Sequence, residues 1–452
     1  MISVNKASLP ARDMRNMQQT SMTHRVEFRR EALPPLATLG REWRMLEAAG
    51  HPTFFTSWQW IGTLLDTVPP GSRPKLLRGR VHGETVALAL LGANERRRHG
   101  LVRSRSLHLN ETGDASFDTL TIEHNAILAV SGSEGAVWDE LMAWFAGVGD
   151  EADELYIGGS RVRLPEEVVE GRGLRRNETT VPSYSIDLCL LEESGGELYP
   201  VLSANARQQL RRALRHFEEF GPLHMRAAKT EAEALGFFAS MKALHCASWA
   251  RRGKPHSFTG TFFEQFHRRL IERSFAEGGT QLLRACAGDR IIGFLYNFRL
   301  GNRIYAYQSG FDDGDRRERP GIVTHALAVR HAFRMGARVY DFMAGRNRLK
   351  ESFATRCEPM LWQVVQQPRF VFRMEDLARR VKRVLRPERN DTADRFTARP
   401  GGGSVCREPG ASCRSFSPAP PGSSASMSPR PCSSGAIECS ASTISTNTMM
   451  WR

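Results

Sequence analysis

Short apolar runs alternate with amphipathic segments along most of the chain. Strand-like runs such as PKLLRGRV, ETVALALLGA and ELYIGGS occur with segments of helical periodicity, WQWIGTLLDTV and EGAVWDELMAWFAGV. From residue 181 the same alternation repeats, with a strand over SYSIDLCL and helices near 197–219, 231–250 and 261–277. Strands and helices mixed in this order predict an α/β or α+β fold with a largely antiparallel centre.

The second region continues with further strands. Period-2 alternation predicts strands at 281–287, 291–299 and 303–309, and helical periodicity predicts a helix after Gly321. Two more strand-like runs, RVYDFM and MLWQVVQQPRFVF, follow this helix. We therefore expect an N-terminal domain over residues 26–180 and a C-terminal domain over residues 181–390.

Both ends of the chain have a different character. Residues 1–25 contain no apolar run of the kind found in signal peptides, which predicts a flexible leader. Residues 391–452 are dominated by Ser, Pro and Gly, which predicts a disordered tail. The Arg, Pro, Ser and Cys bias of this segment also resembles an out-of-frame translation of GC-rich DNA, so a genuine tail and a frame error both stay open.

Composition narrows the class of protein. The 452 residues are 41% hydrophobic and 25% charged, as in a soluble globular protein, and no apolar run approaches 18 residues. The cysteines form no C-x-x-C pair and no Cys/His cluster with metal spacing, which predicts reduced thiols in a cytoplasm and no bound metal. A net charge of +14 favours polyanionic partners such as RNA, anionic lipid or a phosphorylated cofactor, although an arginine-rich proteome gives the same balance.

Several familiar motifs are absent. The chain has no G-x-G-x-x-G, no Walker loop, no G-x-S-x-G and no H-E-x-x-H. Their absence argues against the simplest nucleotide hydrolase, dehydrogenase, esterase and metalloprotease assignments.

The segment YQSGFDDGDRRERPG, residues 307–321, leads from an expected strand into an expected helix. A strand, a loop and a helix entered at glycine are typical of a phosphate site, because the first N–H groups of a helix are free and its N-terminal end is positive. Arg316, Arg317 and Arg319 would add charge-assisted contacts. An ordinary solvated loop has the same composition, so this alternative stays open.

Two further segments carry candidate chemistry. In MKALHCASWARRGKPHSF, a helix that ends at Gly253 places Arg252 and His256 beside His245, and a histidine there has a pKa suited to a general base. In YDFMAGRNRLKESF, Asp341 follows a strand and is either a base or an ion-pair partner of a neighbouring arginine. A purely structural role is the alternative for His245.

Two basic amphipathic helices are expected, at 204–221 and 376–389. The first fits contact with phosphate or an RNA backbone, and the second fits an interfacial helix on an anionic membrane. The alternative for the first is the solvated face of a packed helix, and the alternative for the second is a C-terminal helix docked on its own domain.

The order of these motifs resembles a known family. N-x-R-x-x-L-R-R…F-E-x-x-G at 205–221, H-x-x-x-W-x-x-R-G at 245–253, G-F-D…P-G at 310–321 and Y-D-F-x-x-G…K at 340–350 resemble the CelD/BcsL-type acetyltransferases. These BioF-like proteins of the GNAT superfamily are associated with cellulose and other exopolysaccharide synthesis and are related to the FemABX aminoacyl transferases. The resemblance covers roughly residues 40–375.

The resemblance implies two GNAT-like acyltransferase domains in tandem, with mixed central sheets flanked by helices. The C-terminal domain is then expected to bind acetyl-CoA or another acyl-CoA at a strand end and a helix entrance. The implied contacts are Gln308, Ser309, Gly310, Arg316, Arg319, Gly321, Ile322 and Val323. Arg319 stands where the superfamily signature has a glycine, which weakens this assignment.

GNAT chemistry is direct attack of an amine or hydroxyl on a thioester. It implies His245 or Asp341 as base, a backbone N–H near Ser309 and Gly310 as oxyanion donor, and Tyr307 or Tyr340 as acid. Acceptor contacts are expected from Trp249, Arg252 and Lys350. The family pattern G-D-x-x-Y-K reads GRNRLK here, without the acid and the tyrosine, so an altered or inactive copy stays open.

Three functions are compatible with these residues. The first is an acyl-CoA-dependent N- or O-acyltransferase acting on a saccharide precursor or a small amine. The second is a FemABX-like transferase that uses aminoacyl-tRNA, and the third is a non-catalytic accessory protein of a polysaccharide synthase. All three imply a cytoplasmic protein, with peripheral contact to the inner membrane as an option, and none specifies the acceptor, the acyl chain length or the oligomeric state.

Overall fold

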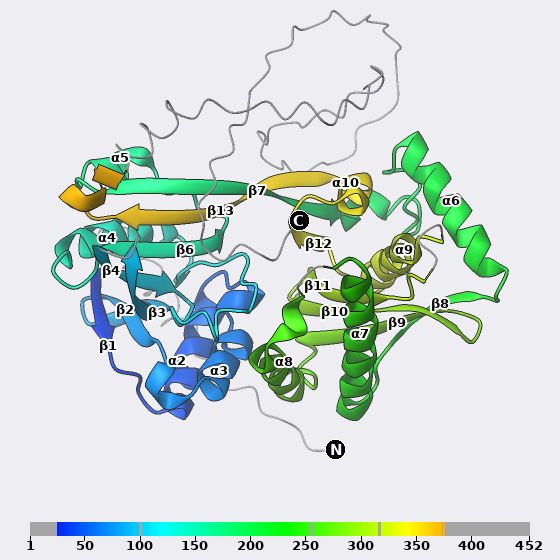
Figure 1. Cartoon of the computed structure of the whole chain (residues 1–452), viewed down its shortest axis with the longest axis horizontal. Helices are drawn as coiled ribbons and strands as arrows, with labels where there is room; N and C mark the ends of the chain where they lie inside the picture. Colours follow the sequence, from blue (N-terminus) through cyan, green and yellow to red (C-terminus); the bar gives the residue numbers. More distant parts are fainter. Residues whose placement is uncertain (1–24, 99–101, 254–255, 315–317, 373, 376–452) are drawn as a thin grey trace, which may run out of the picture. The chain divides into compact units, whose positions relative to one another are not determined.

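The computed structural model describes residues 25–98, 102–253, 256–314, 318–372 and 374–375 (Figure 1). Apart from Arg25, the expected leader lies outside the described residues. The expected tail and the basic segment 376–389 lie outside them as well. We therefore describe the compact unit that precedes residue 388.

Thirteen strands of the described residues form one mixed sheet, in the order β1-β2-β3-β4-β6-β13-β7-β12-β11-β10-β9-β8, with β5 paired to β3. The strands are β1 (Glu27–Glu31), β2 (Lys75–Val81), β3 (Glu84–Arg98), β4 (Val102–Leu109), β5 (Leu128–Ala129), β6 (Glu154–Ser160), β7 (Arg175–Asp187), β8 (Leu223–Ala227), β9 (Thr280–Ala287), β10 (Arg290–Leu300), β11 (Arg303–Phe311), β12 (Val339–Ala344) and β13 (Arg356–Gln366).

Helices flank this sheet (Figure 1). The α-helices are α2 (Leu36–Ala49), α3 (Trp58–Thr67), α4 (Glu134–Gly147), α5 (Glu166–Glu170), α6 (Ala204–Glu218), α7 (Glu231–Arg251), α8 (Thr261–Ser274), α9 (Pro320–Arg334) and α10 (Arg348–Phe353). Short 3₁₀ helices are η1 (Phe54–Thr56), η2 (Pro70–Ser72), η3 (Leu188–Leu191) and η4 (Ser257–Thr259).

The sheet consists of two halves with the same pattern. In each half, four antiparallel strands (β1 to β4, β8 to β11) are followed by a strand that pairs in parallel with the fourth, β6 on β4 and β12 on β11. A helix, α4 or α9, lies between the two parallel strands in the sequence, as parallel pairing requires. The chain therefore repeats one supersecondary arrangement.

The two halves exchange their last strands. β7, which follows β6 in the sequence, pairs with β12, whereas β13, which follows β12, pairs with β6. β7 and β13 also pair with each other over eleven positions, from Arg175↔Gln366 to Ser185↔Arg356. β7 runs across residue 180, where the sequence predicts a domain boundary, and the sheet is continuous there.

An aromatic core continues from one half into the other. Phe54 of η1 stacks on Phe298 of β10 at 4.3 Å between ring centroids, and Trp60 of α3 packs edge-on against Phe266 of α8 at 4.7 Å. Phe298 lies 4.5 Å from Tyr307 of β11. Buried aromatic pairs of this kind stabilise a fold by more than their buried area alone provides. This core therefore holds the N-terminal half against β11, the strand that carries the expected site.

Candidate active site

β11 and β12 separate shortly after they begin to pair. Their parallel register covers three positions, ending at Tyr305↔Asp341. Beyond it, β11 continues along β10 as far as Phe311, while β12 approaches β7 again at Ala344. The two strands therefore enclose a wedge, which we call the β11–β12 wedge (residues 306–311 and 342–344), with backbone groups that do not pair across it.

Helix α9 begins beyond this wedge. Arg319 precedes it in the left-handed conformation (φ 57°) and is exposed, Pro320 is the first helical residue, and no side chain caps the helix. No acidic residue lies in its first turn. A Cβ at Gly321 would come within 3.3 Å of Phe311 and 3.4 Å of Leu349. The helix entrance is therefore uncapped and closely packed against the wedge.

The loop between β4 and β5 (residues 110–127), which we call the β4–β5 loop, reaches both strands of the wedge from the other half. The backbone N–H of Thr121 donates to the hydroxyl of Tyr307 at 3.2 Å. The N–H of Ala344, at the end of β12, donates to Oε2 of Glu123 at 2.7 Å. The wedge is thus lined by both halves of the chain.

Gly159 of β6 keeps this loop in place. It has a φ of 63°, and a Cβ there would lie 2.2 Å from the carbonyl oxygen of Ile122. We expect Gly159→Ala to lower the free energy of unfolding by about 2–3 kcal/mol, because it adds a backbone clash to the cost of a positive φ. Gly173→Ala is the matched control, since Gly173 also has a positive φ (71°) but nothing lies within 4 Å of its Cβ position.

Urea unfolding of both glycine variants tests this assignment. The control should lose only about 1 kcal/mol. If both variants lost the same free energy of unfolding, the close approach of the loop to β6 would make no contribution to stability.

Asp341 is surrounded by basic groups. Its side chain is fully buried, with Oδ2 2.8 Å from Nη1 of Arg303, 3.0 Å from Nε2 of His124 and 3.9 Å from Nη2 of Arg161. Burial alone would raise the pKa of Asp341, but these three neighbours outweigh it and lower the pKa below its usual range. Its Oδ1 also accepts from the N–H of Met343 at 2.8 Å. The arrangement describes an ion-pair centre rather than a proton acceptor.

Glu123 has the opposite character. It is 1% exposed, and burial raises its pKa to about 7, although its hydrogen bond with Ala344 and the charge of Lys350 oppose this rise. Lys350 donates to the carbonyls of Met343 and Ala344 at 3.2 and 2.6 Å, and burial lowers its pKa to about 8. A carboxyl and an amine that both titrate near neutral pH therefore lie together at the end of β12.

Met343 lies at the centre of this arrangement in a strained conformation. Its φ is 67°, which side chains other than glycine rarely adopt. Its N–H binds Asp341 and its carbonyl accepts from Lys350. Strain of this kind persists where the surrounding contacts over-determine the backbone, and it is often found at functional sites.

His245 contacts the other strand of the wedge. Its Nδ1 lies 2.9 Å from the carbonyl oxygen of Ser309, so this nitrogen carries the proton. Its Nε2 is buried without a hydrogen-bond partner, and burial lowers the pKa of the ring. His245 therefore presents a neutral imidazole with a free lone pair, next to the ring of Trp249 at 5.6 Å.

The two candidate acids differ in their surroundings. Tyr307 lies on β11 with its hydroxyl at the β4–β5 loop, whereas the hydroxyl of Tyr340 is fully buried 3.2 Å from Nδ1 of His325. Burial raises the pKa of both tyrosines far above the usual value. Both therefore keep their protons at neutral pH.

The remaining expected residues are placed as follows. Gln308 donates to Oγ of Ser257 at 3.1 Å, Gly310 packs against the carbonyl of Met241 in α7, and Arg252 pairs with Asp313 at 3.1 Å. Ile322 and Val323 belong to the first turn of α9. Arg316 lies outside the described residues.

Among the described residues, neither a metal site nor a membrane-spanning helix is found. The described residues contain no group of three or more His, Cys, Asp or Glu side chains that could hold a metal ion. No helix in the same part of the chain combines the length and the apolar character needed to cross a membrane.

Comparisons with known proteins agree with this geometry. Residues 204–351 match the family model of the acetyltransferase (GNAT) domain. No curated protein matches the chain in sequence. The matched segment contains α6 to α9, both strands of the wedge and Lys350, so this part of the chain resembles a GNAT acetyltransferase domain.

Several solved structures are similar to about three quarters of the chain. FemX has a TM-score of 0.50 at 10% identity, over 74% of this chain and 98% of its own. The C-terminal domain of a putative lysylphosphatidylglycerol synthetase from Agrobacterium fabrum has a TM-score of 0.46 at 12% identity, over 77% and 97%. A tandem GNAT protein from the clavulanic acid biosynthesis pathway has a TM-score of 0.37 at 10% identity, over 75% and 98%. The expectation of two GNAT-like halves in one mixed α/β fold is confirmed.

Proposed function

We propose that this chain transfers an acyl group, in the first instance acetyl from acetyl-CoA, to an amine or hydroxyl of a polysaccharide precursor. The observation that carries the proposal is the pairing of a β-strand wedge with Glu123, a carboxyl whose pKa burial raises to about 7. A base of that pKa accepts a proton at neutral pH and is still strong enough to assist an attacking amine. The saccharide acceptor is supported by the sequence resemblance.

The uncapped N-terminus of α9 suits the phosphates of CoA. Free N–H groups and a positive helix end stabilise anions, and no carboxylate in the first turn opposes them. Glu318, which precedes the helix, is held by Arg290 at 2.7 Å and by His216 at 3.2 Å. Arg319, although it replaces a glycine, is exposed and can turn toward a phosphate.

In the proposed reaction the acceptor nitrogen or oxygen forms a bond to the thioester carbonyl carbon, and the carbon–sulfur bond then breaks. The proton of the nucleophile passes to the carboxylate of Glu123, and a backbone N–H of β11 near Ser309 and Gly310 stabilises the oxyanion. Tyr307 keeps its proton and donates a hydrogen bond to the departing sulfur. The neutral imidazole of His245 is a second candidate base, whereas Asp341 acts as an ion-pair partner.

Lys350 is assigned a positioning role. Its ammonium group binds two carbonyls at the end of β12 and favours the charged form of Glu123. Trp249 and Arg252, on and just after α7 beside His245, are proposed to contact the acceptor.

Gly321→Val is expected to weaken acetyl-CoA binding at least about tenfold with the fold intact. A valine side chain would crowd Phe311 and Leu349 at the helix entrance, where the phosphates are proposed to lie. Gly135→Val is the matched control, because Gly135 is also the second residue of a helix, with nothing within 4 Å of its Cβ position. Titration calorimetry of the three proteins with acetyl-CoA gives the result, and unchanged affinity in Gly321→Val would remove α9 from the site.

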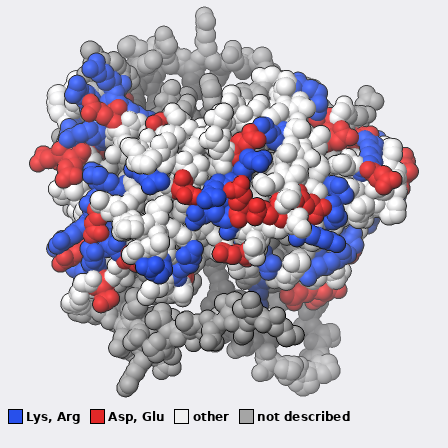
Figure 2. All heavy atoms as spheres, turned by 90° about the horizontal axis from the view of Figure 1, so that it is seen from below, with Lys and Arg blue, Asp and Glu red and all other residues white. Residues whose placement is uncertain are grey.

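Transfer from aminoacyl-tRNA is the second candidate. The exposed side chains of Arg211, Arg212 and Arg215 on α6 favour contact with a nucleic-acid backbone. On the face seen in Figure 2, however, acidic side chains lie among the basic ones and no continuous basic surface is visible. Binding of tRNA that survives moderate salt, without affinity for acetyl-CoA, would favour this candidate; affinity for neither would favour the accessory protein.

A further inference from the structure

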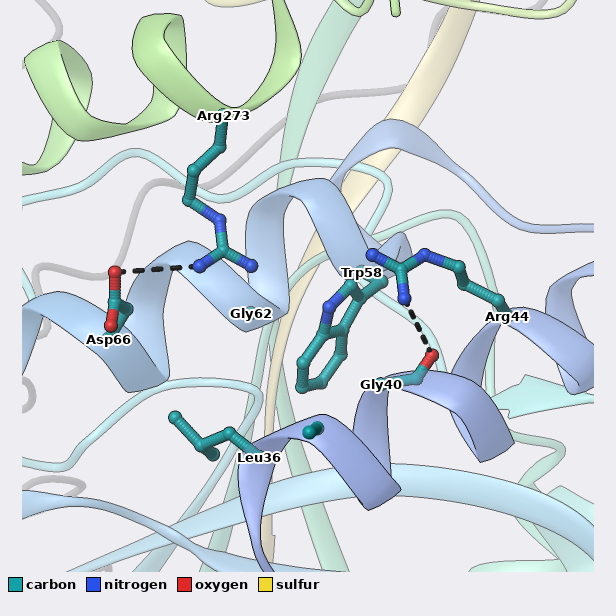
Figure 3. A pocket seen from close by; sticks show the side chains of 8 residues that line it. Leu36, Gly40, Arg44, Trp58, Gly62, Asp66 and Arg273 are labelled. Carbon is teal, nitrogen blue, oxygen red and sulfur yellow. Dashed lines mark hydrogen bonds and ion pairs between the residues drawn. The ribbon is translucent and has the colours of Figure 1, made fainter. Parts of the chain in front are cut away.

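A pocket lies on the opposite side of α3 from the aromatic core. It has a volume of about 260 Å³ and lies between α2, α3 and α8 (Figure 3). Trp58, Gly62 and Asp66 line it at helical spacing of four residues, whereas Trp60, two positions on, faces Phe266 and Tyr307. The pocket is therefore separate from the β11–β12 wedge.

The indole of Trp58 forms one wall of this pocket. The residue is only 5% exposed, and its ring lies so close to Gly40 and Gly62 that a Cβ at either position would be 2.7 Å away. The indole N–H has no acceptor among the described residues, and its nitrogen is not closed off from solvent. In Figure 3 this nitrogen lies on the side of the ring that faces Arg273. The pocket thus contains an unpartnered donor on a rigid, almost completely buried side chain.

The other polar groups around the pocket are mainly donors. Arg273 of α8 and Arg44 of α2 line it, and the Arg44 guanidinium lies 6.0 Å from the centre of the Trp58 ring. The first turn of α2, at Leu36 and Ala37, also lines the pocket; it has neither a capping side chain nor an acidic residue. Its leading N–H groups therefore add positive potential.

The acidic residue of the pocket is already engaged. Asp66 accepts from Arg269 at 2.7 Å and from Arg273 at 3.4 Å, while Arg269 is shared with Glu272 at 3.2 Å. Leu36 and the face of Trp58 supply apolar surface beside these donors (Figure 3). The chemistry of the walls is that of a site for an anion with an apolar part.

We infer that this pocket binds a small organic oxyanion, a carboxylate or a phosphate monoester, independently of acyl transfer. The anionic group lies among the Trp58 N–H, Arg273 and the start of α2, and its apolar part lies against Leu36 and the indole. The volume is just below the range of about 300–1,000 Å³ typical of drug-sized ligands, which limits the ligand to a small molecule.

Titration calorimetry of the full chain with phenyl phosphate, phenylacetate, inorganic phosphate and phenol tests the inference. At least one of the two organic anions should bind saturably at millimolar concentration or below. Phenol and inorganic phosphate should each bind at least about tenfold more weakly than that anion. Phenol lacks the anionic group, and inorganic phosphate lacks the apolar ring. If phenol bound as tightly as the organic anion, the anionic assignment would be wrong. If inorganic phosphate bound as tightly, the apolar assignment would be wrong. If neither organic anion showed saturable binding, the pocket would not be a binding site.

Two variants and one control variant locate the bound anion. Arg273→Gln should weaken the better organic anion at least about tenfold, while Arg269→Gln should not, because Arg269 also pairs with Asp66 but does not line the pocket. Ala37→Phe should fill the pocket from an exposed position of α2 and abolish binding. Acetyl-CoA affinity and melting temperature should be unchanged in Ala37→Phe. Equal losses in the two arginine variants, or retained binding in Ala37→Phe, would place the anion elsewhere.

Discussion

Glu123→Gln is expected to lower kcat by about 10²–10³-fold and to leave acetyl-CoA affinity unchanged, because general-base catalysis is worth roughly that much. The amide can still accept from the N–H of Ala344, as the carboxylate does at 2.7 Å, but it cannot take a proton. In the unchanged protein, activity should rise with pH through about 7, as Glu123 loses its proton. The variant should lose this rise. Steady-state kinetics from pH 5.5 to 9 with acetyl-CoA and an amine acceptor measure both effects.

Glu111→Gln is the matched control for this experiment. Glu111 belongs to the same β4–β5 loop, and burial, together with the nearby charge of Asp118, raises its pKa to about 8. It contacts neither strand of the wedge through any hydrogen bond that the described residues show. Its replacement should leave kcat and the pH profile unchanged. A similar loss of activity in both variants would mean that the loop, rather than the carboxyl of Glu123, is what catalysis needs.

The free energy of unfolding shows whether Glu123→Gln loses activity through lost catalysis or through a destabilised fold. Because the pKa of Glu123 is raised from 4.5 to about 7 in the folded chain, its protonated form is favoured there, and the free energy of unfolding falls as pH rises through this window. The penalty at pH 8 is up to about 3 kcal/mol. Glu123→Gln removes it, so the variant should be at least as stable as the unchanged protein at pH 8. A less stable variant at that pH would contradict the assigned environment of this carboxyl.

Asp341→Asn is expected to lower the free energy of unfolding by about 3–5 kcal/mol, because it leaves Arg303 and Arg161 beside a buried neutral group. The pKa of Asp341 is lowered in the folded chain, so its contribution is present above the pKa of the unfolded carboxyl, near pH 4. The contribution is lost only as pH falls below that value. The difference between the two proteins should therefore be constant from pH 8 to about pH 5 and shrink in stronger acid. Urea unfolding at pH 7 and pH 3.5 measures it.

Asp66→Asn provides the comparison for this variant. Asp66 also pairs with two arginines, Arg269 and Arg273, but its side chain is 31% exposed, so solvent screens the pairs. The loss there should be below about 1 kcal/mol. If Asp341→Asn cost no more than Asp66→Asn, the buried cluster would not hold the end of β12.

The sequence predicts the elements of the C-terminal half well because their core faces are apolar. Period-2 alternation places β9, β10 and β11 within two residues of their observed bounds, and α9 begins two residues before the expected start. β4 is not recognised, because one of its faces consists of the buried polar residues Ser104, Ser106 and His108, and the other places only Leu107 and Leu109 in the core. Ser104 is satisfied there by the carboxylate of Glu154 at 2.7 Å. A polar face paired in this way leaves no hydrophobic signal.

Local sequence patterns do not predict how segments that are distant in the sequence pair with one another. The helix that begins at 204 instead of 197 and the strand exchange of β7 and β13 both depend on tertiary contacts. The same applies to Asp341, which pairs with Arg303 and Arg161 rather than with the arginines that follow it in the sequence. The domain boundary at 180 stays a prediction.

Sequence reasoning also missed Glu123. It lies in TIEHNAILAV, a stretch without a motif, and reaches β12 only because the β4–β5 loop crosses to the other half. A glutamate beside Ile122 and close to a long apolar run was the one available sign of burial. Lys350, by contrast, was found from the resemblance, since it closes the Y-D-F-x-x-G…K spacing.

The exchange of β7 and β13 affects how the chain folds during translation. β6 ends at residue 160, but its partner β13 begins at residue 356, so the edge of β6 has no partner while the intervening residues are translated. At 5–20 residues per second this takes about 10–40 s. An unpaired strand edge invites pairing with other chains during that interval. Each half therefore lacks a strand partner until β13 is translated, and we expect chaperones to protect the free edge during synthesis.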